Sequence, residues 1–308
     1  MSKRNLLSIL LVFTCTVGGY AQSKPVFNPP LNYPNIRDFA LSENGKEAYV
    51  TAQSWLEEIS VIIRLRKDGE QWKEQGIANF SGKYKDLEPF LAEGDLALYF
   101  ASNRPKEDDS TSLNYDLWKV ERNSLEAPWG KPVNLGPVVN SVHNEFYPSL
   151  SKNGNLYFTS DRPCEFELDN IFKSEWTGEK FEEPQPLDSN INSKGYEYNA
   201  LITIDEQCLI FGAYKRPDGL GSGDLYISCK NKKGKWSAAR NLGTEVNSKQ
   251  MDYCPFYDYK NQMLYYTSKR SDLIDSQAIK SLKDLQNTLW QGENGGSKIY
   301  QQKIVLKP

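Results

Sequence analysis

The sequence predicts an all-β protein, a five-bladed β-propeller with four antiparallel strands in each blade. Three observations lead to this fold class. A unit of 50 to 59 residues recurs along the chain, aromatic residues make up 12% of it, and the last unit lacks one strand that the first residues can supply. Repeats of this length with four short strands are typical of propeller blades, and aromatic rings pack well on pleated sheets.

Each unit contains a hairpin that starts at an anchor position. The anchors lie 50, 59, 52 and 55 residues apart and are Phe39, Pro89, Pro148, Ala200 and Pro255. A turn rich in Gly, Asn or Asp follows, and then an apolar-aromatic cluster such as LALYF or NLYF. This pattern indicates a tight hairpin. Five hairpins predict five blades, and six blades are the less favoured count.

Two further strands follow the hairpin within a unit. The third strands are predicted at 115–120, 169–174, 224–229 and 297–302, and the fourth strands within 71–80, 128–136, 180–188 and 235–243. A tryptophan or phenylalanine stands near the start of each fourth strand. We expect these four rings in the core: Trp72, Trp129, Phe181 and Trp236.

The last unit ends at Pro308 without a fourth strand. Near the other end of the chain, "KPVFN" (24–28) resembles "KPVNL" (131–135), which stands at a similar distance before its own anchor. We therefore expect residues 24–28 to pair with 297–305 as the outermost strand of the last blade. Such closure ties the two ends of the chain together and removes an open sheet edge.

The first 21 residues have the pattern of a secretory signal peptide. Lys3 and Arg4 precede an apolar run, and the small residues Gly19 and Ala21 favour cleavage before Gln22. Lipidation at Cys15 is not favoured, because the residues before it form a poor lipobox. No other apolar run is long enough to cross a membrane. We expect residues 22–308 to form one exported domain that is periplasmic, associated with the outer membrane or secreted, and monomeric.

The units resemble the TolB-type, WD40-like propeller repeat of bacterial cell-envelope proteins. The passage that carries the resemblance best is "GLGSGDLYISCKNKKGKWSAARNLGTEVNSKQMDYCPFYDYKNQMLYYTS" (219–268), and the resemblance extends over roughly 36–308. It implies a propeller fold. It leaves function open, because the same blades serve in binding proteins, scaffolds and enzymes.

An acid stands three residues before four of the anchors, and an arginine follows each second strand of the same units. Glu145 and Arg162 should face each other across one hairpin, and the other pairs fit the same count. We expect four intrablade ion pairs, in which the arginine holds the acid ionised. The alternative is a ligand-binding ring at the channel mouth. The residues are Asp86, Arg104, Glu145, Arg162, Glu197, Arg216, Asp252 and Arg270.

Composition argues against several classes of site. The chain has one histidine, His143, and its four cysteines after the signal peptide lack metal-ligand spacing, so no metal or cofactor is predicted. A net charge of -3 gives no indication of a nucleic-acid partner. Cys208 and Cys229 should lie opposite each other on neighbouring strands, with their disulfide state open, as is that of Cys164 and Cys254.

An insert at about 272–292 in the last unit predicts an amphipathic helix. Asp275 or Ser276 would cap it and Gly292 would end it. We expect its apolar face to pack on the propeller, with a partner surface as the alternative. That face consists of Ile274, Ala278, Leu282, Leu285 and Leu289.

The favoured function is that of an exported, non-catalytic module that binds an envelope protein or a glycan through loops on one face of the propeller. The alternative is a five-bladed glycoside hydrolase-like enzyme that uses the channel-mouth carboxylates. Glycosidases need two carboxylates in different environments, whereas the four mouth acids all have an arginine partner. No G-x-S-x-G nucleophile motif is present.

Overall fold

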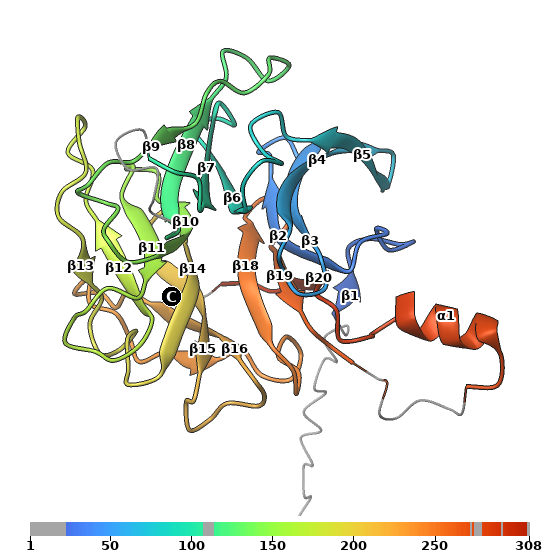
Figure 1. The fold of residues 1–308 in the computed structure, drawn as a ribbon. Helices are drawn as coiled ribbons and strands as arrows, with labels where there is room; N and C mark the ends of the chain where they lie inside the picture. Colours follow the sequence, from blue (N-terminus) through green and yellow to red (C-terminus); the bar gives the residue numbers. More distant parts are fainter. Residues whose placement is uncertain (1–22, 107–113, 272, 274–278, 291, 307–308) are drawn as a thin grey trace, which may run out of the picture.

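The computed structural model describes residues 23–106, 114–271, 273, 279–290 and 292–306. In these residues the chain forms five four-stranded sheets, arranged as blades around a central channel (Figure 1). The predicted five-bladed, all-β propeller is confirmed. The predicted signal peptide lies outside the described residues. Among the described residues, no helix has the length and apolarity needed to cross a membrane.

The strands of each blade follow the order of the repeat, and the first strands of neighbouring blades contact one another around the channel. The innermost strands are β2 (Asn35–Leu41), β6 (Asp86–Ala92), β10 (Glu145–Leu150), β14 (Tyr196–Ile202) and β18 (Asp252–Asp258). The second strands are β3 (Glu47–Gln53), β7 (Ala97–Ser102), β11 (Leu156–Ser160), β15 (Cys208–Tyr214) and β19 (Met263–Ser268). The third strands are β4 (Ser60–Asp68), β8 (Asp116–Glu121), β12 (Asn170–Ser174), β16 (Asp224–Cys229) and β20 (Lys298–Lys303). The outermost strands are β5 (Gln71–Ile77), β9 (Val133–Asn134), β13 (Gln185–Pro186), β17 (Arg240–Asn241) and β1 (Lys24–Pro25).

The short strand β1 closes the ring by pairing with β20 in blade five. Lys24 is the ladder partner of Gln301, and Pro25 is that of Tyr300. The hydroxyl of the buried Ser23 donates to the carbonyl of Glu245 at 2.6 Å, which adds a contact with the neighbouring blade. The predicted closure is confirmed, although the paired segment is shorter than 24–28, because Phe27 turns into the core instead.

Each innermost strand carries a β-bulge one residue before its anchor. The bulged residue has a positive φ in every blade, between 51° and 60°, a conformation that costs a non-glycine residue roughly 1–2 kcal/mol. Its fivefold repetition indicates that the surrounding contacts hold the backbone in place. These residues, called the channel ring below, are Asp38, Glu88, Tyr147, Asn199 and Cys254.

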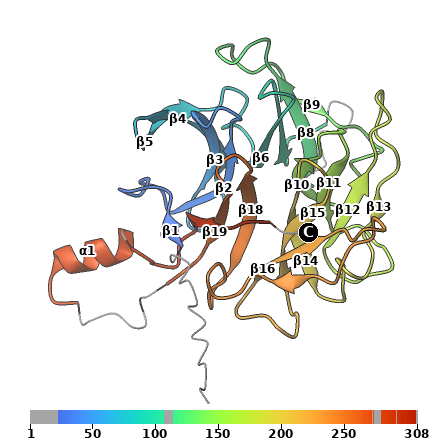
Figure 2. The same cartoon turned by 180° about the vertical axis from the view of Figure 1, so that it is seen from behind.

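The insert forms a shorter helix than predicted, α1 (Leu282–Trp290), which projects from the propeller beside blades five and one (Figures 1 and 2). Ser281 caps it, since its hydroxyl accepts the backbone N–H of Asp284 at 3.0 Å. Residues 274–278, with the predicted caps Asp275 and Ser276, lie outside the described residues. The predicted stop at Gly292 agrees with the end of the helix at Trp290.

The expectation that the apolar face of this helix packs on the propeller is wrong for the described residues. None of the residues of α1 is buried, and Leu282 is 78% exposed. Its contact with the blades is at its end, where the ring of Trp290 lies 6.0 Å from that of Trp55 in the loop after β3. A long insert therefore leaves the helix outside the ring, because the inter-blade core is already filled by the strands.

Deletion of residues 23–30 should destabilise the protein by several kcal/mol, because it exposes the edge of β20 and removes the buried Phe27. Lys24→Ala is the matched control, because the exposed side chain of Lys24 is not needed for the backbone pairing. Thermal melts of the three proteins provide the measurement. A deletion variant that melts with the wild type would contradict the closure.

Candidate functional site

The eight charged residues predicted at the channel mouth form four acid–arginine pairs. Each acid stands at or next to the first residue of an innermost strand, and each arginine lies two residues beyond the end of a second strand. All four carboxylates are fully buried. The shortest carboxylate–guanidinium distances are 2.5 Å for Asp86–Arg104, 2.8 Å for Glu145–Arg162, 3.0 Å for Glu197–Arg216 and 3.8 Å for Asp252–Arg270.

The pairs are diagonal, not directly opposite as predicted. Ser160 is the ladder partner of Glu145, and Arg162 lies two residues farther along and reaches back to the carboxylate. The count from the sequence was two residues off because the turn is offset by one and the bulge in β10 shifts the register by one more. The ion pair forms nonetheless, because an arginine side chain is long enough to span this diagonal.

Each arginine also joins its blade to the connection from the preceding blade. Arg162 donates to the carbonyl of Val139 at 2.5 Å, and its guanidinium lies over the rings of Phe158 and Phe172 at 5.4 and 5.3 Å. Arg104 has the equivalent contact with the carbonyl of Phe80. The mouth pairs therefore hold adjacent blades together, which is a structural use of their charges.

An Asn-Ser pair before each of three acids completes this arrangement, and the sequence analysis missed it. Ser141 donates its N–H and its hydroxyl to Glu145, at 3.1 and 2.6 Å. Asn140 bonds both the N–H and the carbonyl of Leu117. The repeated signal was visible as "VNSVHNE", "INSKGYE" and "VNSKQMD".

Blade five has the loosest of the four pairs. Neither Asp252 Oδ1 nor Arg270 Nε makes a hydrogen bond, and Arg270 instead donates to the hydroxyl of Tyr266 at 2.8 Å. Burial raises the pKa of the carboxyls of Asp252 and Glu145 above their ordinary values, despite their hydrogen bonds and arginines. At these two positions desolvation is the largest effect on the pKa and acts against the arginine.

The channel ring lies two residues deeper along the innermost strands, and its members meet across the channel. Asn199 donates to Glu88 Oε1 at 3.1 Å, although the two residues belong to blades four and two. The N–H of Tyr147 donates to Glu88 Oε2 at 2.7 Å. The sulfur of Cys254 lies 3.4 Å from Asn199 Oδ1. All five members are buried.

Arg37 balances the two acids of the ring. Its guanidinium bonds Asp38 at 2.8 Å and Glu88 at 2.7 Å, and it also contacts the sulfur of Cys254 at 3.2 Å. Burial, partly offset by Arg37, raises the pKa of Glu88 to about 7. The ring thus closes the channel with a hydrogen-bonded polar layer to which all five blades contribute.

This layer was also missed from the sequence. Its residues stand directly before the anchors, yet they differ in every unit, so they were not part of the repeated pattern. The signal that could have revealed this layer is a polar residue directly before the anchor, between apolar neighbours, whose identity changes from unit to unit. The arginine is present in blade one alone, where the aligned residues of the other units are Leu87, Phe146, Tyr198 and Tyr253.

Asp38, Glu88 and Cys254 are also a group of metal-ligand types, with donor atoms within 4.8 Å of one another. Arg37 already bonds all three, so a metal cation here would lie beside a guanidinium cation. These residues do not fit a metal ion.

An open cavity of about 1290 Å³ lies on the face where the hairpin turns gather, opposite the mouth pairs. We call it the turn-face cavity. The ends of all five innermost strands contribute to its lining, with apolar residues such as Leu41, Leu150 and Phe256. At its inner end, Phe90 packs against the core cluster of Leu201 and Tyr257, on the far side of the channel. An apolar layer thus lies beneath the polar ring.

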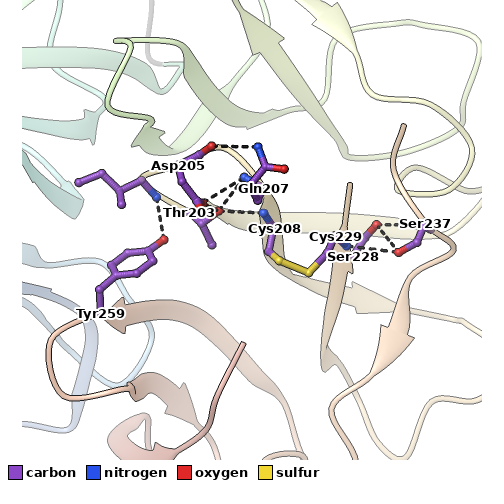
Figure 3. The surroundings of a disulfide bond; sticks show 9 residues. Thr203, Asp205, Gln207, Cys208, Ser228, Cys229, Ser237 and Tyr259 are labelled. Carbon is purple, nitrogen blue, oxygen red and sulfur yellow. Dashed lines mark hydrogen bonds between the residues drawn. A yellow bond between two sulfur atoms is a disulfide. The ribbon is translucent and has the colours of Figure 1, made fainter. Parts of the chain in front are cut away.

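A disulfide supports one wall of this cavity. Cys208 and Cys229 are ladder partners and are bonded, which confirms the predicted adjacency and resolves their open redox state (Figure 3). Cys208 begins β15 directly after the turn that presents Ile204 to the cavity. The backbone N–H of Ile204 donates to the hydroxyl of Tyr259 at 2.7 Å, so the turn is fixed to blade five as well. Cys164 and Cys254 are free.

No protein-family model and no curated protein matches the chain. Solved structures do. The chain is similar to a putative TolB from Agrobacterium tumefaciens, with a TM-score of 0.50 and 11% identity over 88% of this chain and 91% of that one. It is also similar to an endo-arabinase from Bacteroides thetaiotaomicron, with a TM-score of 0.53 and 15% identity over 93% and 98%.

TolB from Acinetobacter baumannii also matches, with a TM-score of 0.47 and 13% identity over 87% of this chain. The chain spans 54% of the length of that protein. At these identities the likeness establishes the fold, a TolB-like β-propeller. It does not select between the function classes, because a putative TolB and an endo-arabinase both share the architecture.

Glu145→Gln should leave a partly buried arginine without its counter-charge and lower stability by roughly 1–3 kcal/mol. Arg162→Ala should cost a similar amount, and the double variant should lose less than the sum, because contacting residues are not additive. Denaturant melts of the four proteins measure this coupling. The exposed pair Lys180–Glu182 is the control, and its cycle should give less than about 0.5 kcal/mol. Additive, near-zero effects at Glu145 and Arg162 would return the mouth acids to the candidates for a binding site.

Proposed function

We propose that the protein is an exported, non-catalytic propeller that binds a protein or glycan partner in the cell envelope through its turn-face cavity. The signal-peptide pattern of residues 1–21 supports export. The observation that carries the binding role is the contrast between the two ends of the channel. Charged groups at the mouth and in the ring are bonded to one another, whereas the cavity on the other face is open and largely apolar.

The position of the cavity differs from the loop face expected from the sequence. Its rim consists of the hairpin turns, which differ from unit to unit while the strands beneath them repeat. Several apolar side chains of the lining remain open to solvent, among them Val138 (40% exposed), Ile204 (50%) and Tyr259 (42%). Exposed apolar surface gathered in one concave place is typical of a binding site.

One observation favours the second candidate function, a glycoside hydrolase-like enzyme. Asp38 and Glu88 are two carboxylates at the channel, and the pKa of Glu88 is raised to about 7, as suits a general acid. Three facts weigh against this role. Both carboxylates are bonded by Arg37, both are at most 3% exposed, and neither lines the cavity. A sugar ring could not reach them without opening the polar layer.

Hydrolysis and partner retention together test the proposal. Purified protein incubated with linear arabinan and an aryl arabinofuranoside should release no sugar above the level of Glu88→Gln. Immobilised protein should retain a component of an envelope extract, and Ile204→Glu should abolish that retention by placing a charge in the cavity. The matched control is Val142→Glu, because Val142 is 88% exposed and lies in the connection that leads to the channel mouth. Sugar release that Glu88→Gln removes, or retention that Ile204→Glu leaves intact, would contradict the proposal.

A further inference from the structure

Three of the interfaces between consecutive blades contain equivalent aromatic slots. In these, a tyrosine of one blade's second strand (Tyr49, Tyr99 or Tyr157) belongs to the same interface as the aromatic residue that precedes the next blade's fourth strand (Trp129, Phe181 or Trp236). Between blades one and two, Trp129 Nε1 donates to the hydroxyl of Tyr49 at 2.9 Å. Between blades three and four, Trp236 shares a core cluster with Tyr157. Both indoles are buried, with exposures of 6% and 8%.

The slot between blades two and three is filled less completely. Phe181 takes the place of the tryptophan, so the larger indole and its N–H donor are both missing. Phe181 is half-buried, and it lines the turn-face cavity together with Tyr99. The residues of the two filled slots do not line that cavity. The cavity therefore extends outward between these two blades.

The hydrogen bonds along the rim agree with this opening. The turns of blades one and two are joined by the N–H of Glu43 and the carboxylate of Asp95. Those of blades three and four are joined by Lys152 N–H and the carbonyl of Ile204, at 2.9 Å. In the described part of the chain, no such bond joins the turns of blades two and three.

We propose that this slot binds an aromatic side chain presented by a segment of a partner protein. This inference rests on the proposed binding function and names the chemistry of its partner. The molecule itself indicates the occupant, because an indole fills the equivalent space in two sister slots. Trp176, which is 37% exposed and lies 4.8 Å from the ring of Phe181, offers an aromatic wall. Pro137 and Val138 are apolar lining residues contributed by the connection from blade two to blade three.

The polar groups of the slot favour an aromatic side chain over a sugar. Lys119, which lies over the ring of Tyr99, is already bonded to Glu93 and Glu121 at 2.9 and 2.8 Å. The hydroxyl of Tyr99 bonds Glu93 as well. A sugar requires several convergent donors and acceptors, whereas these groups bond one another and leave ring faces and aliphatic surface to the ligand.

Saturation-transfer NMR with N-acetyl-L-tryptophanamide tests the proposal on the full chain. The probe should receive saturation from the wild type. In Phe181→Trp, which fills the slot as in the sister interfaces, the effect should fall about tenfold. Val142→Trp is the matched control, because it adds an indole at the highly exposed Val142, which is not among the lining residues of the cavity, and should bind the probe like the wild type. Trp176→Ala is a second variant at a partly exposed position, and it should weaken the effect several-fold even if Phe181→Trp folds poorly.

N-acetyl-L-leucinamide and a methyl arabinofuranoside are the comparison probes, and both should receive less saturation than the indole. The inference would be overturned if the wild type did not bind the indole probe, or if it preferred the arabinofuranoside. It would also be overturned if Phe181→Trp melted like the wild type and bound the indole probe equally well. A negative result in this NMR experiment would not contradict the proposed function. That proposal is tested separately, by the hydrolysis assay and by the retention of an envelope component by the Ile204→Glu variant.

Discussion

The structure depends on how five innermost strands close a narrow channel without leaving buried polar groups unpaired. Each strand bulges at the same place, and the bulged residue of each is buried. Two of these side chains are carboxylates, and an isolated carboxylate in such a site would be strongly disfavoured. Arg37 bonds both of them, and Asn199 and the N–H of Tyr147 satisfy the remaining positions of Glu88. The centre of the ring is therefore a closed polar layer, not a water-filled pore.

The outer parts of the molecule follow from that centre. The acid–arginine pairs fix the start of four of the five innermost strands to the preceding connection, and the aromatic slots fill the widening space between blades. Strand β1 removes the edge that blade five would otherwise expose. In the described part of the chain, the large open cavity lies on the turn face, away from the paired mouth charges. There the slot between blades two and three is filled by a smaller ring than its neighbours.

The sequence predicted the features that repeat from unit to unit and the closure that depends on matching the two ends of the chain. Blade number, strand order, the closing strand, the ion pairs and the Cys208–Cys229 adjacency all follow from comparing units. The channel ring was not predictable in this way, because its five residues share a backbone conformation but no chemistry. The extension of the cavity between blades two and three lies where Phe181 takes the place of the tryptophans at its aligned positions, a difference that the sequence comparison did not use. The helix was placed wrongly because amphipathic spacing in 274–289 indicates an apolar face but not what covers it.

The central claim is that the channel ring is dry and that its charges are balanced internally, and the titration of Glu88 tests this most directly. Its pKa is about 7 in the folded protein, against 4.5 ordinarily, so the folded state binds this proton more tightly than the unfolded state. Stability of the wild type relative to Glu88→Gln should therefore be greatest below about pH 4.5 and should fall as pH rises through 7. The total change should be on the order of 2–3 kcal/mol. Denaturant melts of both proteins between pH 4 and 8 provide the measurement. A stability difference that stays constant from pH 5 to 8 would mean that Glu88 has an ordinary pKa in contact with water, and that the channel is open.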